Sequence, residues 1–313
     1  MTDRVWQEPD NGLDHAVARF GGKRSEWLDL STGINPVPYP APQLPADTWT
    51  ALPDQAAIAR LVGYARRFWS VPESAVILPT AGTAPIIAAL PHLRPAADVS
   101  IAPPTYSEHA AAFRTAGWTV SATGPDAIVA MHPNMPDGRA WAADQLEAPF
   151  TIIDETYCDV APQASLIHLA ARADTIVIKS FGEFWGLGGL RLGFAIGDPA
   201  IIADLDARIG PWTVSGPALA IGAEALADPD WADETRVRLD RDAERLDAIM
   251  AQQGAPVVGG TALFRLYEVA DAQAAQDHFA SHKIWSRTFP DAPNWLRLGL
   301  PAPDKWAVFD AVF

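Results

Sequence analysis

Apolar residues along the chain follow two spacings, one typical of helices and one typical of strands. Residues 13–20 and 53–69 carry apolar side chains at helical spacing, whereas AVIL at 75–78 is a short strand-like run. Further short runs rich in β-branched residues lie at 99–101, 118–120, 127–130, 151–153 and 175–178. Strands that alternate with helical or proline-rich segments predict an α/β fold with a mainly parallel sheet between helices.

The pattern changes twice, which predicts three parts. Residues 34–45 are proline-rich, so we expect an ordered extended arm there. After a break at 211–217, a charged helix covers 230–254. It leads into a second unit with strands near 261–269, 284–288 and 295–298 and helices near 271–282 and 303–312. We therefore expect an N-terminal arm (1–45) that packs with the small domain, a large domain (46–225) and a small α+β C-terminal domain (226–313).

Composition narrows the range of functions. The chain has 313 residues and a formal net charge of −15, which disfavours nucleic acid and anionic membrane surfaces as partners. Cys158 is the one cysteine, so an intrachain disulfide and a cysteine-based metal site are excluded, and we assign no metal ligands. The start has no signal-peptide pattern, and the apolar runs are far shorter than the ~20 residues that span a bilayer. We expect a cytoplasmic protein.

Three stretches with polar side chains each follow a predicted strand, at the edge where α/β sheets bind ligands. AGTAP (81–85) opens a helix and offers N–H groups and the Thr83 hydroxyl to an anion, although ordinary helix capping also explains it. In TIIDETYCD (151–159), Asp154 and Glu155 end a strand, either as a functional carboxylate or as a helix cap. Tyr106, after two prolines, is placed to cover a planar ligand or simply packs in a turn.

The fourth stretch is KSFGEFWGLGGLRLG (179–193). Arg191 lies among glycines that let an anion approach the backbone, and a guanidinium suits bidentate phosphate binding. In the C-terminal unit, Arg287 and Arg297 lie in apolar strands, where a buried charge needs an anionic partner. A structural salt bridge is an equal explanation for these two arginines.

Taken together, the motifs resemble the pyridoxal 5′-phosphate (PLP) enzymes of the aspartate-aminotransferase fold (fold type I). Within that group the chain is most similar to the threonine-phosphate decarboxylases of cobalamin biosynthesis, which convert L-threonine O-3-phosphate to aminopropanol phosphate. The similarity rests on motifs that span nearly the whole chain in the family's order: DLSTGINPVPYP, AGT, PTYSEH, HPNMPDGR, DETYCD, SFGEFWGLGGLRLGF and WLRLGLP.

The resemblance implies a role for each matching residue. The cofactor phosphate would be held by Gly82, Thr83, Ser180 and Arg191. Tyr106 would stack on the pyridine ring, Asp154 would pair with the ring nitrogen, and Tyr157 would hydrogen-bond the ring hydroxyl. The substrate would be bound by Asn35, Arg287 and Arg297, with Arg297 on its carboxylate. Because sites of this family lie at a subunit interface, the resemblance also implies a homodimer.

The chain departs from the family pattern at its chemical centre. Glu183 occupies the position of the Schiff-base lysine, so covalent attachment of PLP is not expected. Met135 replaces the asparagine that contacts the ring hydroxyl, and His132 replaces an earlier asparagine. The family's early His-Gly-Gly falls on Pro9, Asp10 and Asn11.

Lys179 is not expected to replace the missing amine, because side chains alternate along a strand and its neighbour Ser180 should face the phosphate. A carboxylate cannot perform the imine chemistry, so decarboxylation should be impaired. Three hypotheses stay open at this point. The chain is an altered threonine-phosphate decarboxylase, a catalytically silent homologue that binds a protein of the corrin pathway, or an aminotransferase of the histidinol-phosphate type.

Overall fold

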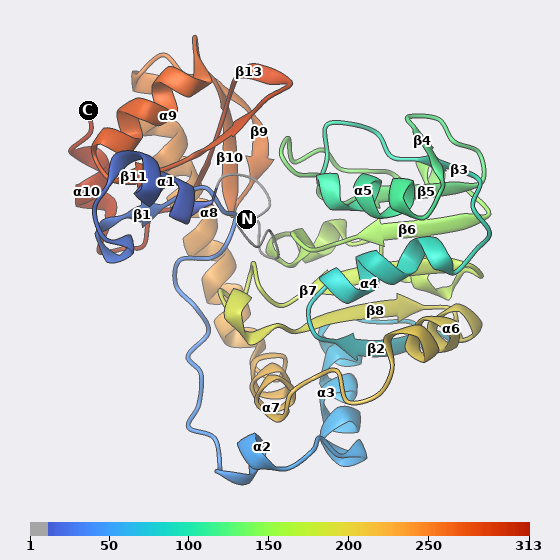
Figure 1. Cartoon of the computed structure of the whole chain (residues 1–313). Helices are drawn as coiled ribbons and strands as arrows, with labels where there is room; N and C mark the ends of the chain where they lie inside the picture. Colours follow the sequence, from blue (N-terminus) through green and yellow to red (C-terminus); the bar gives the residue numbers. More distant parts are fainter. Residues whose placement is uncertain (1–11) are drawn as a thin grey trace, which may run out of the picture. The chain divides into compact units, whose positions relative to one another are not determined.

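The computed structural model describes residues 12–313, which form two compact units (Figure 1). The larger unit is continuous, from Val37 to Arg238. The smaller unit combines residues 12–36 with Leu239–Phe313. The expected arm and the two expected domain boundaries stay predictions, and Pro9, Asp10 and Asn11 lie outside the described residues.

The larger unit contains a seven-stranded sheet with the order β2-β8-β7-β6-β5-β3-β4. Its strands are β2 (Val76–Thr80), β3 (Asp98–Ser100), β4 (Thr119–Ser121), β5 (Ala127–Met131), β6 (Phe150–Asp154), β7 (Thr175–Ser180) and β8 (Gly193–Gly197). The two pairings of β8, with β2 and with β7, are antiparallel and the other pairings are parallel, so the mainly parallel sheet expected from the sequence is confirmed. The sequence pattern missed β8, because glycines at both ends of GFAIG weaken the strand signal.

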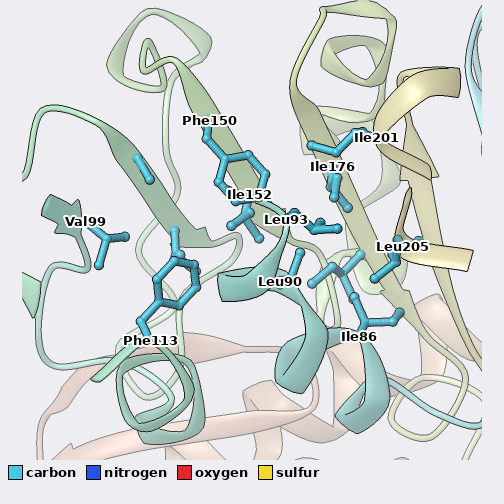
Figure 2. Close-up of a cluster of buried hydrophobic side chains, with 14 of the residues drawn as sticks. Ile86, Leu90, Leu93, Val99, Phe113, Phe150, Ile152, Ile176, Ile201 and Leu205 are labelled. Carbon is cyan, nitrogen blue, oxygen red and sulfur yellow. The ribbon is translucent and has the colours of Figure 1, made fainter. Parts of the chain in front are cut away.

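The helices of the larger unit are α2 (Asp47–Thr50), α3 (Gln55–Phe68), α4 (Ala84–Ala89), α5 (Ser107–Thr115), α6 (Pro199–Ile209), α7 (Gly216–Ala225) and the start of α8 (Pro229–Gln252). Among them, α4, α5 and α6 bury apolar side chains of the sheet. Figure 2 shows Ile86 of α4, Phe113 of α5 and Leu205 of α6 gathered against Ile152 and Ile176 of the sheet. Burial of such side chains stabilises the fold by roughly 1.5–3 kcal/mol each.

Short 3₁₀ turns complete the larger unit. They are η2 (Leu90–His92), η3 (Ala143–Gln145), η4 (Cys158–Val160), η5 (Pro162–Ala164), η6 (Ile167–Ala171) and η7 (Gly188–Leu190). Two of them, η4 and η7, follow the carboxyl ends of β6 and β7 and so shape the edge of the sheet where the polar motifs lie.

The smaller unit has two sheets. An antiparallel sheet has the order β12-β13-β10-β9, and β1 pairs with β11 in parallel. The elements are α1 (Leu13–Phe20), η1 (Arg24–Glu26), β1 (Leu28–Asp29), β9 (Val257–Thr261), β10 (Phe264–Glu268), α9 (Ala272–Ser281), β11 (Ile284–Trp285), β12 (Arg287–Phe289), β13 (Ala292–Gly299) and α10 (Trp306–Asp310). Leu13, Trp27 and Trp285 form part of a core that ties the N-terminal segment to the C-terminal one.

Within residues 12–313, every helix is too short or too polar to cross a membrane.

Candidate active site

The ends of three strands bring the predicted cofactor residues of the larger unit together. Gly193 of β8 pairs with Thr80 on one side and with Ser180 on the other. Asp154 is the last residue of β6, the strand next to β7. The segments that follow Thr80, Asp154 and Ser180 therefore leave the sheet at one edge. This is the edge at which α/β sheets bind ligands.

Asp154 is a buried carboxylate that two groups hold in its ionised form. Nε2 of His109 lies 2.8 Å from Oδ2 of Asp154, and the N–H of Thr156 donates to Oδ1 at 3.0 Å. Burial raises the pKa of Asp154, but the hydrogen bonds from His109 and Thr156 outweigh burial and lower the pKa below its usual value. The side chain is thus a fixed negative charge, suited to a protonated ring nitrogen.

Gly82 lies in close contact with Arg191, at a left-handed backbone position where a side chain would be strained. Gly82 has φ +81°, and a Cβ atom built there would lie 2.6 Å from Nη2 of Arg191. Arg191 itself is left-handed (φ 55°), is exposed, and donates from Nη1 to the Gly188 carbonyl at 3.0 Å. Ser180, from the same sequence motif as Arg191, is buried. Its hydroxyl accepts a hydrogen bond from the Gly182 N–H at 3.3 Å. A bare backbone beside an exposed guanidinium suits a phosphate group.

Glu183 is half-buried, but its carboxyl oxygen Oε2 is buried and has no hydrogen-bond partner. Burial raises the pKa of Glu183 to about 7, and the negative charge of Asp154 acts in the same direction. Hydrogen bonds from the Ser180 hydroxyl and from the backbone N–H of Glu183, together with the charge of Arg191, oppose this shift. The site thus contains an acid that is poised near neutral pH and is incompletely paired.

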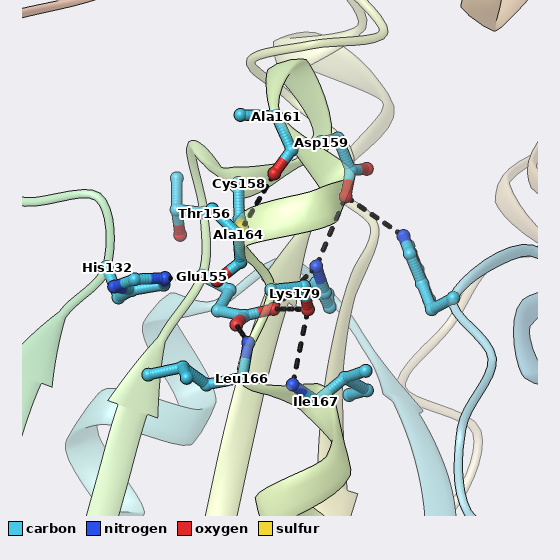
Figure 3. Close-up of polar contacts among 12 residues, drawn as sticks. His132, Glu155, Thr156, Cys158, Asp159, Ala161, Ala164, Leu166, Ile167 and Lys179 are labelled. Carbon is cyan, nitrogen blue, oxygen red and sulfur yellow. Dashed lines mark hydrogen bonds and ion pairs between the residues drawn. The ribbon is translucent and has the colours of Figure 1, made fainter. Parts of the chain in front are cut away.

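Lys179 lies in a separate polar cluster, shown in Figure 3. Its Nζ is 2.7 Å from Oε2 of Glu155 and 3.3 Å from Oδ1 of Asp159, and the side chain is buried. Burial alone would lower the pKa of Lys179, but the two carboxylates raise it above its usual value, so the amine stays protonated. This agrees with the expectation that Lys179 does not replace the missing lysine.

Three potential metal ligands meet beside this cluster, with ligand atoms of His132, Glu155 and Cys158 within 4.8 Å of one another. Each is engaged by protein groups. His132 Nε2 bonds the Ala164 carbonyl at 2.7 Å, and Glu155 pairs with Lys179. Burial raises the pKa of the Cys158 thiol to about 12, which disfavours the thiolate that a metal requires. The trio is part of the packed polar cluster in Figure 3.

Four other predicted cofactor residues lie in the larger unit. The Tyr106 ring meets the His109 ring edge-on, with centroids 6.1 Å apart. Tyr157 is buried and Met135 is half-buried. Thr83 precedes α4, but its side chain makes no capping hydrogen bond, so the capping explanation for its hydroxyl is not supported.

The predicted substrate residues belong to the smaller unit. Arg287 of β12 and Arg297 of β13 are direct cross-strand partners. Arg297 is buried and donates from Nη2 to the Ser31 carbonyl, and Asn35 is also buried. As direct cross-strand partners, Arg287 and Arg297 lie on the same face of the sheet.

Sequence reasoning missed one partner of the site residues and one buried aromatic cluster. His109 lies in the quoted PTYSEH motif, and a polar residue on an alanine-rich helix was a usable signal, but only the fold brings it to Asp154. Trp185 stacks on Phe181 (centroids 4.9 Å apart) and on Trp231 (5.2 Å), forming an aromatic wall next to Glu183 in the chain. The pairing with Trp231 joins residues 46 positions apart, and no local pattern indicates it.

Comparison with known proteins shows the family of the chain. The family model for aminotransferase class I and II matches residues 121–308. A threonine-phosphate decarboxylase of Pseudomonas aeruginosa is 36% identical, with 96% of this chain and 95% of that protein covered. One from a Sinorhizobium species is 39% identical, with 94% and 92% covered.

A solved structure supports the fold. The histidinol-phosphate aminotransferase of Sinorhizobium meliloti in complex with pyridoxal-5′-phosphate has a TM-score of 0.80, at 17% identity over 99% of this chain and 95% of that chain. The chain therefore belongs to the class I and II aminotransferase family, and within it to the group of the threonine-phosphate decarboxylases.

Proposed function

We propose that this chain binds a PLP-type cofactor without a covalent bond and is an impaired threonine-phosphate decarboxylase. The observation that carries the proposal is a carboxylate at residue 183 within an otherwise retained set of cofactor-binding groups. Relatives at 36% and 39% identity over nearly the whole chain bear the name of that enzyme, which supports the substrate class.

The residues fit the phosphate and the ring of PLP but not its covalent attachment. The guanidinium of Arg191 lies against the bare α-carbon of Gly82, where it could bind a phosphate, and the ionised Asp154 matches a protonated ring nitrogen. Glu183 offers no amine, and Lys179 is held by Glu155 and Asp159. When bound, the cofactor supplies an electron-accepting ring for the bond that breaks at the substrate α-carbon. Asp154 would keep the proton on the ring nitrogen, and Tyr106 would cover the ring.

The smaller unit would bind the anionic groups of the substrate. Arg287 and Arg297 face each other across β12 and β13, so they present two guanidinium groups on one side of the sheet. L-Threonine O-3-phosphate carries a carboxylate and a phosphate, which suit such a pair. Asn35 would add a polar contact to the same substrate.

We also propose a homodimer. Trp49, Leu52 and Trp212 are 68%, 71% and 65% exposed, which is unusual for such large apolar side chains. α2, which contains Trp49, lies beside the start of α7, since a Cβ at Gly216 would be 2.2 Å from the Thr48 carbonyl. A second copy packed over α2 would bury Trp49 and the neighbouring Leu52. Sedimentation equilibrium of the wild type and of a Trp49→Asp variant tests this, with dissociation expected in the variant.

A cytoplasmic location stays a prediction.

The decisive experiment compares the wild type with Glu183→Lys. After incubation with PLP and reduction by borohydride, the wild type should show no added mass and the lysine variant should carry one cofactor. Carbon dioxide release from L-threonine O-3-phosphate should be at background for the wild type and measurable for Glu183→Lys. Keto-acid formation instead would indicate an aminotransferase. A wild type that turns over as fast as a lysine-containing relative would overturn the proposal, and a chain that binds no cofactor would favour the non-catalytic role with a corrin-pathway protein.

A further inference from the structure

We propose that Glu183 makes this site select the amine form of the cofactor, pyridoxamine 5′-phosphate, which is held without a covalent bond by pairing of the Glu183 carboxylate with the cofactor ammonium group. The inference rests on the proposed function, because it assumes that the phosphate and the ring lie against Arg191 and Asp154. It concerns which chemical form of the cofactor the chain retains.

The first support is the unsatisfied carboxylate itself. Oε2 of Glu183 is buried and has no hydrogen-bond partner among residues 12–313. Leaving a buried acceptor unpaired costs about 1–3 kcal/mol, and more when the acceptor is charged. A ligand that donates a hydrogen bond to Oε2 removes this penalty on binding.

The second support is that the side chains of Arg191 and Lys179 already interact with other groups of the protein. Arg191 donates from Nη1 to the Gly188 carbonyl, and its Nη2 lies over Gly82, on the side assigned to the phosphate. Lys179 is within 2.7 Å of Glu155 and within 3.3 Å of Asp159. Arg191 thus acts on Glu183 only through its charge, and Oε2 has no hydrogen-bond partner within residues 12–313, so a cationic group of the ligand would supply the missing partner.

The third support is the charge pattern of the ligand. In pyridoxamine 5′-phosphate, the phosphate, the ring nitrogen and the 4′-ammonium group each meet an opposite charge, on Arg191, Asp154 and Glu183 respectively. The aldehyde of PLP ends in an oxygen acceptor at the 4′ position, so an ionised Glu183 would place two acceptors against each other. Pyridoxine 5′-phosphate has a neutral hydroxyl group there and serves as the reference between the two.

The test is a set of equilibrium titrations of the full-length, cofactor-free chain at pH 8.5, followed by tryptophan fluorescence and confirmed by calorimetry. The probes are pyridoxamine 5′-phosphate, pyridoxine 5′-phosphate and PLP. A charge-assisted hydrogen bond should make the amine form bind on the order of tenfold tighter than pyridoxine 5′-phosphate. In Glu183→Gln, which keeps the shape and removes the charge, this preference should disappear while pyridoxine 5′-phosphate binds as before. Glu147→Gln, an exposed change of the same type, should leave all three affinities unchanged.

The outcomes separate the two levels of the proposal. If all three probes bind equally well, or if PLP binds most tightly, the selection by Glu183 is wrong while the cofactor site stands. If none of the probes binds, the cofactor site proposed above is wrong as well. Circular dichroism of Glu183→Gln shows whether that variant folds, and if it does not, the comparison of the three probes on the wild type still decides.

Discussion

In the cofactor-free protein, the unfolding free energy of Glu183→Gln should increase relative to that of the wild type as the pH rises. The fold raises the pKa of Glu183 from 4.5 to about 7, chiefly through burial. Between these two values the folded protein holds a proton that the unfolded chain has released. The free energy of unfolding of the wild type therefore falls as the pH rises through this window, and the loss is complete above about pH 7. Gln does not titrate, so the variant lacks this loss.

The magnitude follows from the two pKa values. At ~1.36 kcal/mol for each pKa unit, the interval from 4.5 to about 7 gives an upper value of about 3.4 kcal/mol. Glu183 is only half-buried, so water screens part of this effect, and we expect roughly 1–2 kcal/mol. Any penalty of the Gln amide itself is independent of pH and appears as a constant offset.

The assay is urea unfolding of the wild type and Glu183→Gln at several pH values from 5 to 8.5, at one protein concentration and in buffers without phosphate. The difference in unfolding free energy between the two proteins should move in favour of the variant by roughly 1–2 kcal/mol from pH 5 to pH 8. Glu147→Gln should show no such movement. A difference that stays constant across this range, or that moves in favour of the wild type, refutes the reasoning.

Three further substitutions test the rest of the site. Asp154→Asn, which leaves His109 without a carboxylate, should weaken binding of PLP-type cofactors by on the order of tenfold in fluorescence titrations, with little change for inorganic phosphate. Lys179→Met leaves two buried carboxylates without their cation and should lower the unfolding free energy by ~3–5 kcal/mol in urea. Gly82→Ala forces a side chain against Arg191 at a left-handed backbone position, and should abolish saturable phosphate binding in calorimetry while Ala88→Gly, on the helix that follows, retains it.

Much of the larger unit could be predicted because its signals are local. Strands β3, β5, β6 and β7 are short apolar runs with β-branched residues, and each lies within about two residues of its predicted position. Asp154 and Ser180 could be placed at strand ends for the same reason. The glycines around Arg191 are visible in the sequence itself, so a role of Arg191 in phosphate binding could be suggested without the structure, and this role stays a prediction.

The remaining features depend on contacts between distant parts of the chain. The pairing of His109 with Asp154 joins residues 45 positions apart. The hydrogen bond from Lys179 to Asp159 joins residues 20 positions apart. Alternation along β7 predicted which way Lys179 does not point, but not which groups neutralise it. Strand β8 escaped prediction because its pairing with β2 and β7, rather than side-chain propensity, makes GFAIG a strand.

The ion pair of Lys179 with Glu155 fastens β7 to the segment that follows β6, without any contribution from residue 183. The framework of the site is thus assembled whether or not the side chain at 183 can react. Glutamate and lysine codons differ by a single base, so one mutation would exchange the proposed non-covalent site for one that could capture the cofactor covalently. The two chemistries would then be neighbouring states in evolution, separated by a point mutation rather than by a rebuilding of the fold.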